Sequence, residues 1–260
     1  MADVLGLHLL AHMDLVASPR RSVVARLDAD GRLRDLDEGA GDDEVIALIE
    51  AHAAPVVVVD APLAVPDAAG RRDAEQVLAW CDVPAFPVSG RRLETVYGGA
   101  RGVALAPRLG AGGRTALEAL PDQVLRQIAW EGAHPPGRPA IPLADYRQAW
   151  LGVRAPRYRS KGVGRAHPDG ILAAWRLLAA VVDLDGWTPA QAPDDWVAIA
   201  DAARIDAICC AYAGLRLARG EAVVVGAPGR GTMVMPADAN LRARVAATIE
   251  RLGGEGTIVT

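Results

Sequence analysis

The chain contains a run of four consecutive valines, from Val56 to Val59. The run contains no polar residue, which is typical of a strand buried on both faces of an α/β sheet. Asp60 follows it, and Pro62 and Pro66 prevent the strand from continuing. Ligands of open α/β sheets bind beyond the carboxyl ends of the strands. Asp60 is therefore either a turn residue or a site residue at the end of a central strand.

The chain before the valine run predicts an antiparallel meander of three strands and then a helix with an acidic first turn. The expected ranges are 4–10, 22–27 and 32–36 for the strands, with a turn at 28–31 and a helix that begins at Asp42. The strand at 56–59 then lies parallel to the first strand after a right-handed crossover. This order places His8 close to Asp60.

The rest of the chain predicts mainly helices and one hairpin. The expected helices cover 71–81, 121–126 (or a turn there), 169–182, 196–218 with a break near Asp201, and 241–252, followed by a short tail; the expected strands cover 127–130, 223–225 and 232–235. Residues 84–113 are rich in Gly and Pro and predict a loop or insertion over the sheet edge. The glycines at 110–113 have no Lys-Ser/Thr after them, so this segment is a poor phosphate loop. We expect one α/β domain over residues 1–260.

Composition bounds the cellular setting. An apolar fraction of 51% and a charged fraction of 23% describe an ordinary soluble globular protein, and no apolar run reaches the ~18 residues that span a bilayer. The three cysteines lack metal-ligand spacing and the start has no basic leader, so we expect a reducing, cytoplasmic location. The net charge of −4 gives no global footprint for nucleic acid, and the oligomeric state is left open.

A basic and aromatic segment covers about 140–165. Its basic residues cluster between Arg154 and Arg165 and include Lys161, the only lysine of the chain. Tyr146, Trp150 and Tyr158 lie nearby in sequence, and bases can stack on such rings, so the segment is a candidate nucleic-acid contact. The alternative is an ordinary solvated face.

Three carboxylates occupy unusual positions. Asp60 and Glu131 each follow an expected strand, and Asp206 lies on an otherwise apolar helix face, where a charge without a partner is costly. If they converge, they repel one another unless a divalent cation neutralises them, and oxygen ligands suit Mg²⁺ or Mn²⁺. Two such ions can support phosphodiester hydrolysis. The alternative is a turn residue, a strand-end residue and a helix Asp with local bonds, because spacing does not show convergence.

Motifs across nearly the whole chain carry a family resemblance. They lie at 4–8 (VLGLH), 59–63 (VDAPL), 130–135 (WEGAHP), 161–165 (KGVGR), 205–213 (IDAICCAYA) and 229–236 (GRGTMVMP). In these motifs the chain resembles the predicted-nuclease family catalogued as domain of unknown function 429, which has an RNase H-like fold. The resemblance implies an antiparallel meander plus parallel strands, flanked by helices. It also implies an acidic metal site at Asp60, Glu131 and Asp206, with Lys161 and Arg165 facing a phosphate.

One position departs from the family pattern. The family carries Asp on the first strand, where this chain has His8, which can ligate Mn²⁺ or Zn²⁺ but is neutral and suits Mg²⁺ poorly. We therefore expect either a metal-dependent nuclease, impaired by this change, or a non-catalytic RNase H-like binding or regulatory module. A nucleotide-binding protein of the actin type is a third reading, and the lack of a phosphate loop argues against it. The residues expected at the site are Asp60, Glu131, Asp206 and Lys161 for catalysis, Arg159, Arg165 and His134 for substrate, and His8 with the three carboxylates for metal.

Overall fold

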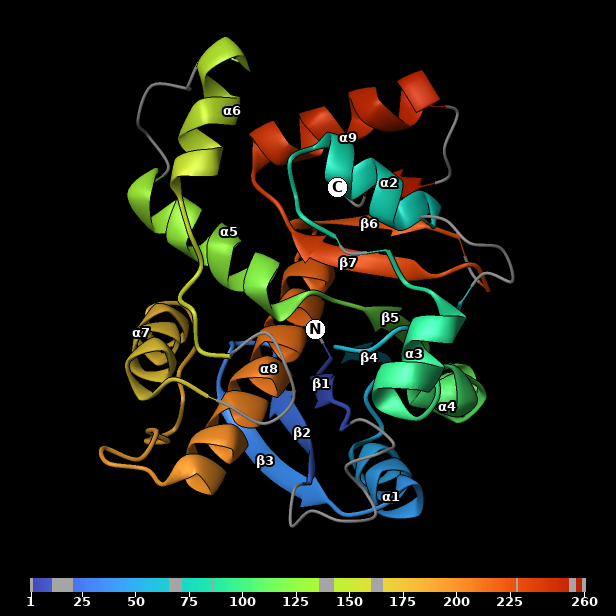
Figure 1. The fold of residues 1–260 in the computed structure, drawn as a ribbon, viewed down its shortest axis with the longest axis vertical. Helices are drawn as coiled ribbons and strands as arrows, with labels where there is room; N and C mark the ends of the chain where they lie inside the picture. The colour runs from blue at the N-terminus through green and yellow to red at the C-terminus, as the bar shows by residue number, and fades with distance from the viewer. Residues whose placement is uncertain are drawn as a thin grey trace.

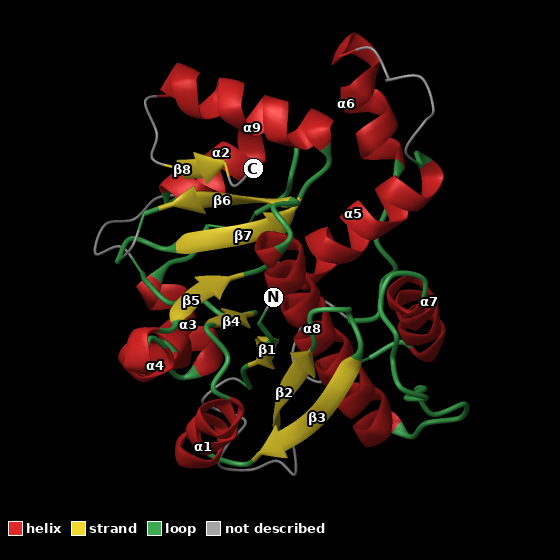
Figure 2. Ribbon diagram, turned by 180° about the vertical axis from the view of Figure 1, so that it is seen from behind, coloured by secondary structure: helices red, strands yellow, loops and turns green. Residues whose placement is uncertain are grey.

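The computed structural model describes residues 2–10, 21–65, 72–85, 87–135, 143–159, 166–227, 229–252 and 256–258. Within these residues, eight strands form one mixed sheet in the order β3-β2-β1-β4-β5-β7-β6-β8, flanked by helices (Figure 1). The strands are β1 Val4–His8, β2 Ser22–Leu27, β3 Leu33–Gly39, β4 Val56–Val59, β5 Thr115–Glu118, β6 Ala222–Gly226, β7 Thr232–Pro236 and β8 Gly256–Ile258. Figure 2 shows the sheet running from β3 at one end to β8 at the other. The predicted α/β class is confirmed.

Nine α-helices and one short 3₁₀ helix accompany these strands in the described part of the chain. They are α1 Asp42–His52, α2 Asp73–Trp80, α3 Gly90–Tyr97, α4 Arg101–Leu109, η2 Ala111–Gly113, α5 Pro121–Ala133, α6 Leu143–Gly152, α7 Pro168–Ala179, α8 Asp195–Ala218 and α9 Ala239–Leu252. Each of the described helices is too short or too polar to cross a membrane.

The strand directions follow the expected RNase H-like arrangement. β1, β2 and β3 form the antiparallel meander, and β4 lies parallel to β1 with Leu7 opposite Val59. β5 extends the parallel part beside β4, with Val59 opposite Glu118. The helix α1 makes the crossover between the meander and β4, as the sequence predicts.

The valine run is buried on both faces because side chains alternate along a strand. Val58 belongs to the apolar cluster under α8, whereas Val57 and Val59 belong to the cluster that includes residues of α1 and α4. β1 alternates in the same way, with Val4 on the α8 side. The even-numbered positions of both strands therefore face α8.

α8 is one continuous helix that lies across one face of the sheet, against β1, β2 and β4. α7 lies beside it (Figure 1). The expected break near Asp201 is wrong, since Asp201 is itself buried within the helix. The helix lies unusually close to β1 at Gly6, where a Cβ atom would stand 2.0 Å from the Ala207 carbonyl oxygen and 2.2 Å from the Ala211 nitrogen.

Several local expectations are wrong. Residues 84–113 are not a loop, because they contain α3 and α4, and α4 buries Leu105 and Leu109 at helical spacing. Residues 127–130 are not a strand but part of α5, which begins with Pro121 at its first turn. A short segment with three apolar residues, such as Ile-Ala-Trp here, does not distinguish a strand from a buried helix segment. The structure also contains α6, β5 and β8, which the sequence analysis does not predict.

Candidate metal centre

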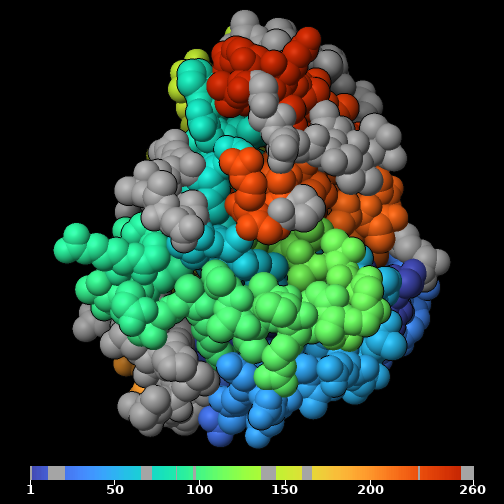
Figure 3. Space-filling view, turned by 90° about the vertical axis from the view of Figure 1, so that its right-hand side faces the viewer, coloured from blue at the N-terminus to red at the C-terminus, as the bar shows by residue number. Residues whose placement is uncertain are grey.

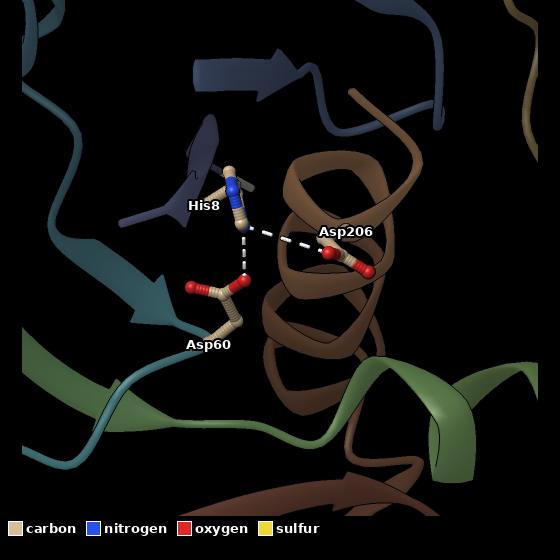
Figure 4. A group of neighbouring side chains, drawn as sticks. All are labelled: His8, Asp60 and Asp206. Carbon is tan, nitrogen blue, oxygen red and sulfur yellow. Dashed lines mark hydrogen bonds and ion pairs between the residues drawn. The ribbon is translucent and has the colours of Figure 1, made fainter. Parts of the chain in front are cut away.

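The site lies where β1 and β4 end side by side. His8 is the last residue of β1 and Asp60 directly follows β4, and the Asp60 amide donates to the Leu7 carbonyl at 3.1 Å, continuing the parallel ladder. Both residues have even numbers in strands whose even positions face α8, so both side chains point towards that helix. Figure 4 shows His8 and Asp60 reaching from the two strands towards Asp206 on α8.

Asp60 is held by two donors from the end of β1. The Leu9 amide donates to Asp60 Oδ1 at 2.8 Å, and His8 Nδ1 makes a short hydrogen bond to Asp60 Oδ2. An ionised carboxylate only accepts hydrogen bonds, so His8 Nδ1 is the donor of this bond when Asp60 is ionised. The expected proximity of His8 and Asp60 is confirmed.

Asp206 completes the cluster from α8. Its Oδ2 lies 3.5 Å from His8 Nδ1 and forms an ion pair with Arg159, while its Oδ1 accepts from the Tyr158 hydroxyl. Burial raises the pKa of Asp206 and Asp60 adds repulsion, whereas the charges of Arg159 and His8 act in the opposite direction. The pKa of Tyr158 is raised well above its ordinary value by burial and by Asp206.

The Tyr158–Arg159 segment is positioned by α7. The Tyr158 carbonyl accepts from the His167 amide at 3.0 Å, next to the start of the helix. A side chain at Gly170 would stand 2.0 Å from the Arg157 carbonyl oxygen, so only glycine allows this approach. The sequence predicts Arg159 as a substrate contact and Tyr158 as a stacking ring, and it does not predict the bonds of these two residues to Asp206.

His8, Asp60 and Asp206 form a group able to hold a metal ion. One ligand atom from each lies within 4.8 Å of the others, and all three side chains are almost fully buried. Two carboxylate oxygens and one imidazole nitrogen are donors that Mn²⁺ and Zn²⁺ accept readily. The donor set fits such an ion, with two protein contacts in competition: His8 Nδ1 already bonds Asp60 Oδ2, and the Arg159 guanidinium already pairs with Asp206 Oδ2.

Glu131 is not part of this group. It lies on α5, where it forms an ion pair with Arg216 at 2.7 Å and accepts from Gln127 at 2.8 Å. Arg216 is ten residues beyond Asp206, about 15 Å along the axis of α8. The expectation that Glu131 shares a site with Asp60 and Asp206 fails because the strand that was to present it is a helix.

The strand-end carboxylate next to Asp60 is instead Glu118, on β5. It lies opposite Val59 and therefore points away from α8, to the other face of the sheet. There it accepts from Arg72 Nη1 at 2.7 Å and from the Leu63 amide at 2.9 Å. Arg72 also donates to the Ala64 carbonyl at 2.9 Å, so this buried pair fixes the segment that follows Asp60. The sequence Thr-Ala-Leu-Glu is a weak strand pattern, so it does not predict Glu118 as a carboxylate at a strand end.

The remaining predicted site residues lie elsewhere or outside the described residues. His134 ends α5 and stacks on Trp130 with ring centroids 3.8 Å apart, so it belongs to that contact and not to the cluster. Tyr146, Trp150 and Tyr158 are at most 1% exposed, which excludes them as stacking surfaces for bases in this conformation. Lys161 and Arg165 lie outside the described residues.

Comparison with known proteins finds no match among family models, curated proteins or solved structures. The resemblance to domain of unknown function 429 stays a prediction. The fold and the geometry of the cluster therefore carry the functional argument.

Proposed function

We propose that this chain is a metal-dependent phosphodiester hydrolase of the RNase H-like type, in keeping with its resemblance to domain of unknown function 429. The observation that supports the proposal is the convergence of His8, Asp60 and Asp206 from β1, β4 and α8 in a sheet of RNase H-like arrangement. The ends of parallel strands are where such sheets bind ligands.

His8, Asp60 and Asp206 would hold the ion. Mn²⁺ fits the donor set better than Mg²⁺, because imidazole nitrogen is a poor ligand for Mg²⁺. A bound divalent ion supplies Lewis-acid activation of a phosphoryl oxygen and of water in this chemistry.

The protein groups around the cluster have separate tasks in this proposal. The Leu9 amide and the Tyr158 hydroxyl each fix one carboxylate oxygen, and the other two oxygens, Asp60 Oδ2 and Asp206 Oδ2, both lie beside His8 Nδ1. Arg159 is about one-third exposed and can release Asp206 towards solvent, where its guanidinium would pair with a substrate phosphate. Lys161 and Arg165 are proposed as further phosphate contacts from the same segment.

Metal binding and cleavage test the proposal separately. Titration calorimetry with Mn²⁺ should show one saturable site, and the purified protein should hydrolyse bis(p-nitrophenyl) phosphate or single-stranded nucleic acid only with that ion. Asp60→Asn and Asp206→Asn should abolish both. Glu131→Gln is the matched control, since it removes a carboxylate that the structure places with Arg216, and it should keep the metal affinity. Equal loss of Mn²⁺ binding in all three variants would refute the assignment.

A second candidate is a non-catalytic module with the same fold. Its support is that all four carboxylate oxygens of Asp60 and Asp206 already have protein donors, from Leu9, His8, Tyr158 and Arg159. A cluster neutralised in this way is stable with no ion present.

Arg159→Gln separates the two functions. If Arg159 competes with a metal, its removal should tighten Mn²⁺ binding. If Arg159 is the permanent counter-ion, the variant should lose stability and gain no metal affinity. His8→Asp gives a further comparison: nuclease activity with Mg²⁺ that appears only in this variant would mark the native site as inactive.

A further inference from the structure

A groove separate from the metal centre lies between α2, α6 and α9. It has a volume of about 420 Å³ and is lined by Ala79, Trp80, Asp82, Arg147, Arg244 and Arg251. This volume falls in the range of small-molecule sites, roughly 300–1,000 Å³. In the space-filling view, the atoms of α9 and of the α2 region lie side by side at the top of the molecule (Figure 3).

The groove carries a local positive charge on a chain whose net charge is −4. The lining has three guanidinium groups and one carboxylate, Asp82, which accepts from Arg147 Nε at 3.0 Å and from Arg244 Nη2 at 2.7 Å. Asp82 and Arg244 are largely buried, whereas the Arg147 side chain is 70% exposed. Asp82 therefore fixes the positions of Arg147 and Arg244. The three arginines and one aspartate leave the lining residues with a net charge of about +2.

Trp80 presents a large aromatic surface beside these charges. It is 54% exposed, and the Arg251 guanidinium lies 4.4 Å from its ring centroid. This cation–π contact restrains the indole at the edge of the groove. An exposed indole next to guanidinium groups matches a ligand that joins a flat aromatic ring to an anion.

We propose that this groove binds a nucleotide, with its base on Trp80 and its phosphate on Arg147 and Arg251. The nucleotide is either free or part of a single strand, which share this chemistry. Guanidinium groups bind phosphate with paired donors, and bases of any kind stack on an indole. An acidic peptide would satisfy the arginines but would leave the indole in water.

The site lies at the β6 end of the sheet, with β5 and β7 separating that end from the β1–β4 junction in strand order (Figures 1 and 2). The inference goes beyond the proposed hydrolase activity and does not depend on it. Binding is therefore measured in EDTA, where a metal-dependent reaction does not operate, and Asp60→Asn should bind as the wild type does.

Fluorescence anisotropy with a labelled short single-stranded oligonucleotide, and calorimetry with nucleoside monophosphates, test the proposal. Trp80→Ala should weaken binding about fivefold or more, since stacking contributes on that scale. Arg147→Gln should weaken it several-fold and reduce its salt dependence. Comparable affinity for mononucleotide and oligonucleotide identifies a free nucleotide as the ligand, and binding of the oligonucleotide alone identifies a strand.

Two variants outside the groove serve as matched controls. Trp196→Ala removes an indole that is 52% exposed, and Arg32→Gln removes an arginine side chain that is 56% exposed. Both should bind within about twofold of the wild type. No saturable binding by the wild type, or equal losses in the controls, would overturn the proposal. Tighter binding of polyglutamate than of the oligonucleotide would overturn it as well, because the indole would then have no part in recognition.

Discussion

Replacement of Gly6 by alanine should disrupt the contact that creates the candidate metal centre. Gly6 shares the α8-facing side of β1 with His8, and its missing side chain lets the helix approach the strand. The Cβ atom of an alanine would stand 2.0 Å from the Ala207 carbonyl oxygen and 2.2 Å from the Ala211 nitrogen. Both atoms are backbone atoms of a buried helix, so no side-chain rotation relieves the overlap.

The size of the effect follows from the distance that α8 must move. Ordinary contact begins at 3.4 Å, so the helix must retreat by about 1.4 Å from β1 at this point. A gap of ~0.5–1 Å already forfeits a quarter to a half of a dispersion contact, and the helix packs on β1, β2 and β4 together. Overpacking typically costs ~1–3 kcal/mol, and we expect about 3 kcal/mol here because rigid backbone opposes rigid backbone. For a chain of this size, that corresponds to a Tm lower by roughly 6–12 °C.

Thermal unfolding followed by circular dichroism measures this effect. Gly132→Ala is the control: it lies in α5 with open space around its Cβ, and should be neutral or more stable by up to ~1 kcal/mol. The Gly6 variant should also lose Mn²⁺ binding, because Asp206 moves away from His8. A Tm for Gly6→Ala within about 2 °C of the wild type would refute the reasoning, because it would mean that a Cβ atom fits between β1 and α8 at this position.

Three further predictions concern the rest of the chain. Arg72→Met should destabilise the protein by ~3–5 kcal/mol near pH 8 by leaving buried Glu118 without its cation. Burial raises the pKa of Glu118, so the stability from this group is full below the usual Glu range and is lost as pH rises through the raised value; the Tm deficit of the variant should be larger at pH 8 than at pH 5. The three cysteines are fully buried, and burial raises the pKa of each thiol, so native protein should not react with a thiol reagent such as DTNB, whereas urea-unfolded protein should react fully. Ala53 ends α1 with a φ of 48°, so Ala53→Gly should raise stability by about 0.5–1 kcal/mol, measured as a higher Tm, and a lower Tm would contradict the strain.

Much of the fold is predictable because its signals are local. The valine run, the turn glycine at Gly31 and the acidic start of α1 each specify a conformation through steric or electrostatic effects within a few residues. Errors arise where two conformations explain the same short pattern. Residues 127–130 are mostly apolar, which is compatible with either a strand or a helix. In the structure they form part of α5, which packs against α8.

Two of the three members of the candidate site follow from local sequence patterns. The alternation of side chains along β1 and β4, with the parallel pairing that the crossover imposes, brings His8 and Asp60 together on one face. The family resemblance names Asp206 and Glu131 alike, and only the packing of α8 and α5 shows that Asp206 joins the pair and Glu131 does not. Asp206 joins the cluster because Gly6 lets α8 lie against β1, and Glu131 leaves it because α5 pairs it with Arg216. Which carboxylates share the site therefore depends on how closely elements that are far apart in the sequence pack together, and no local sequence pattern specifies that distance.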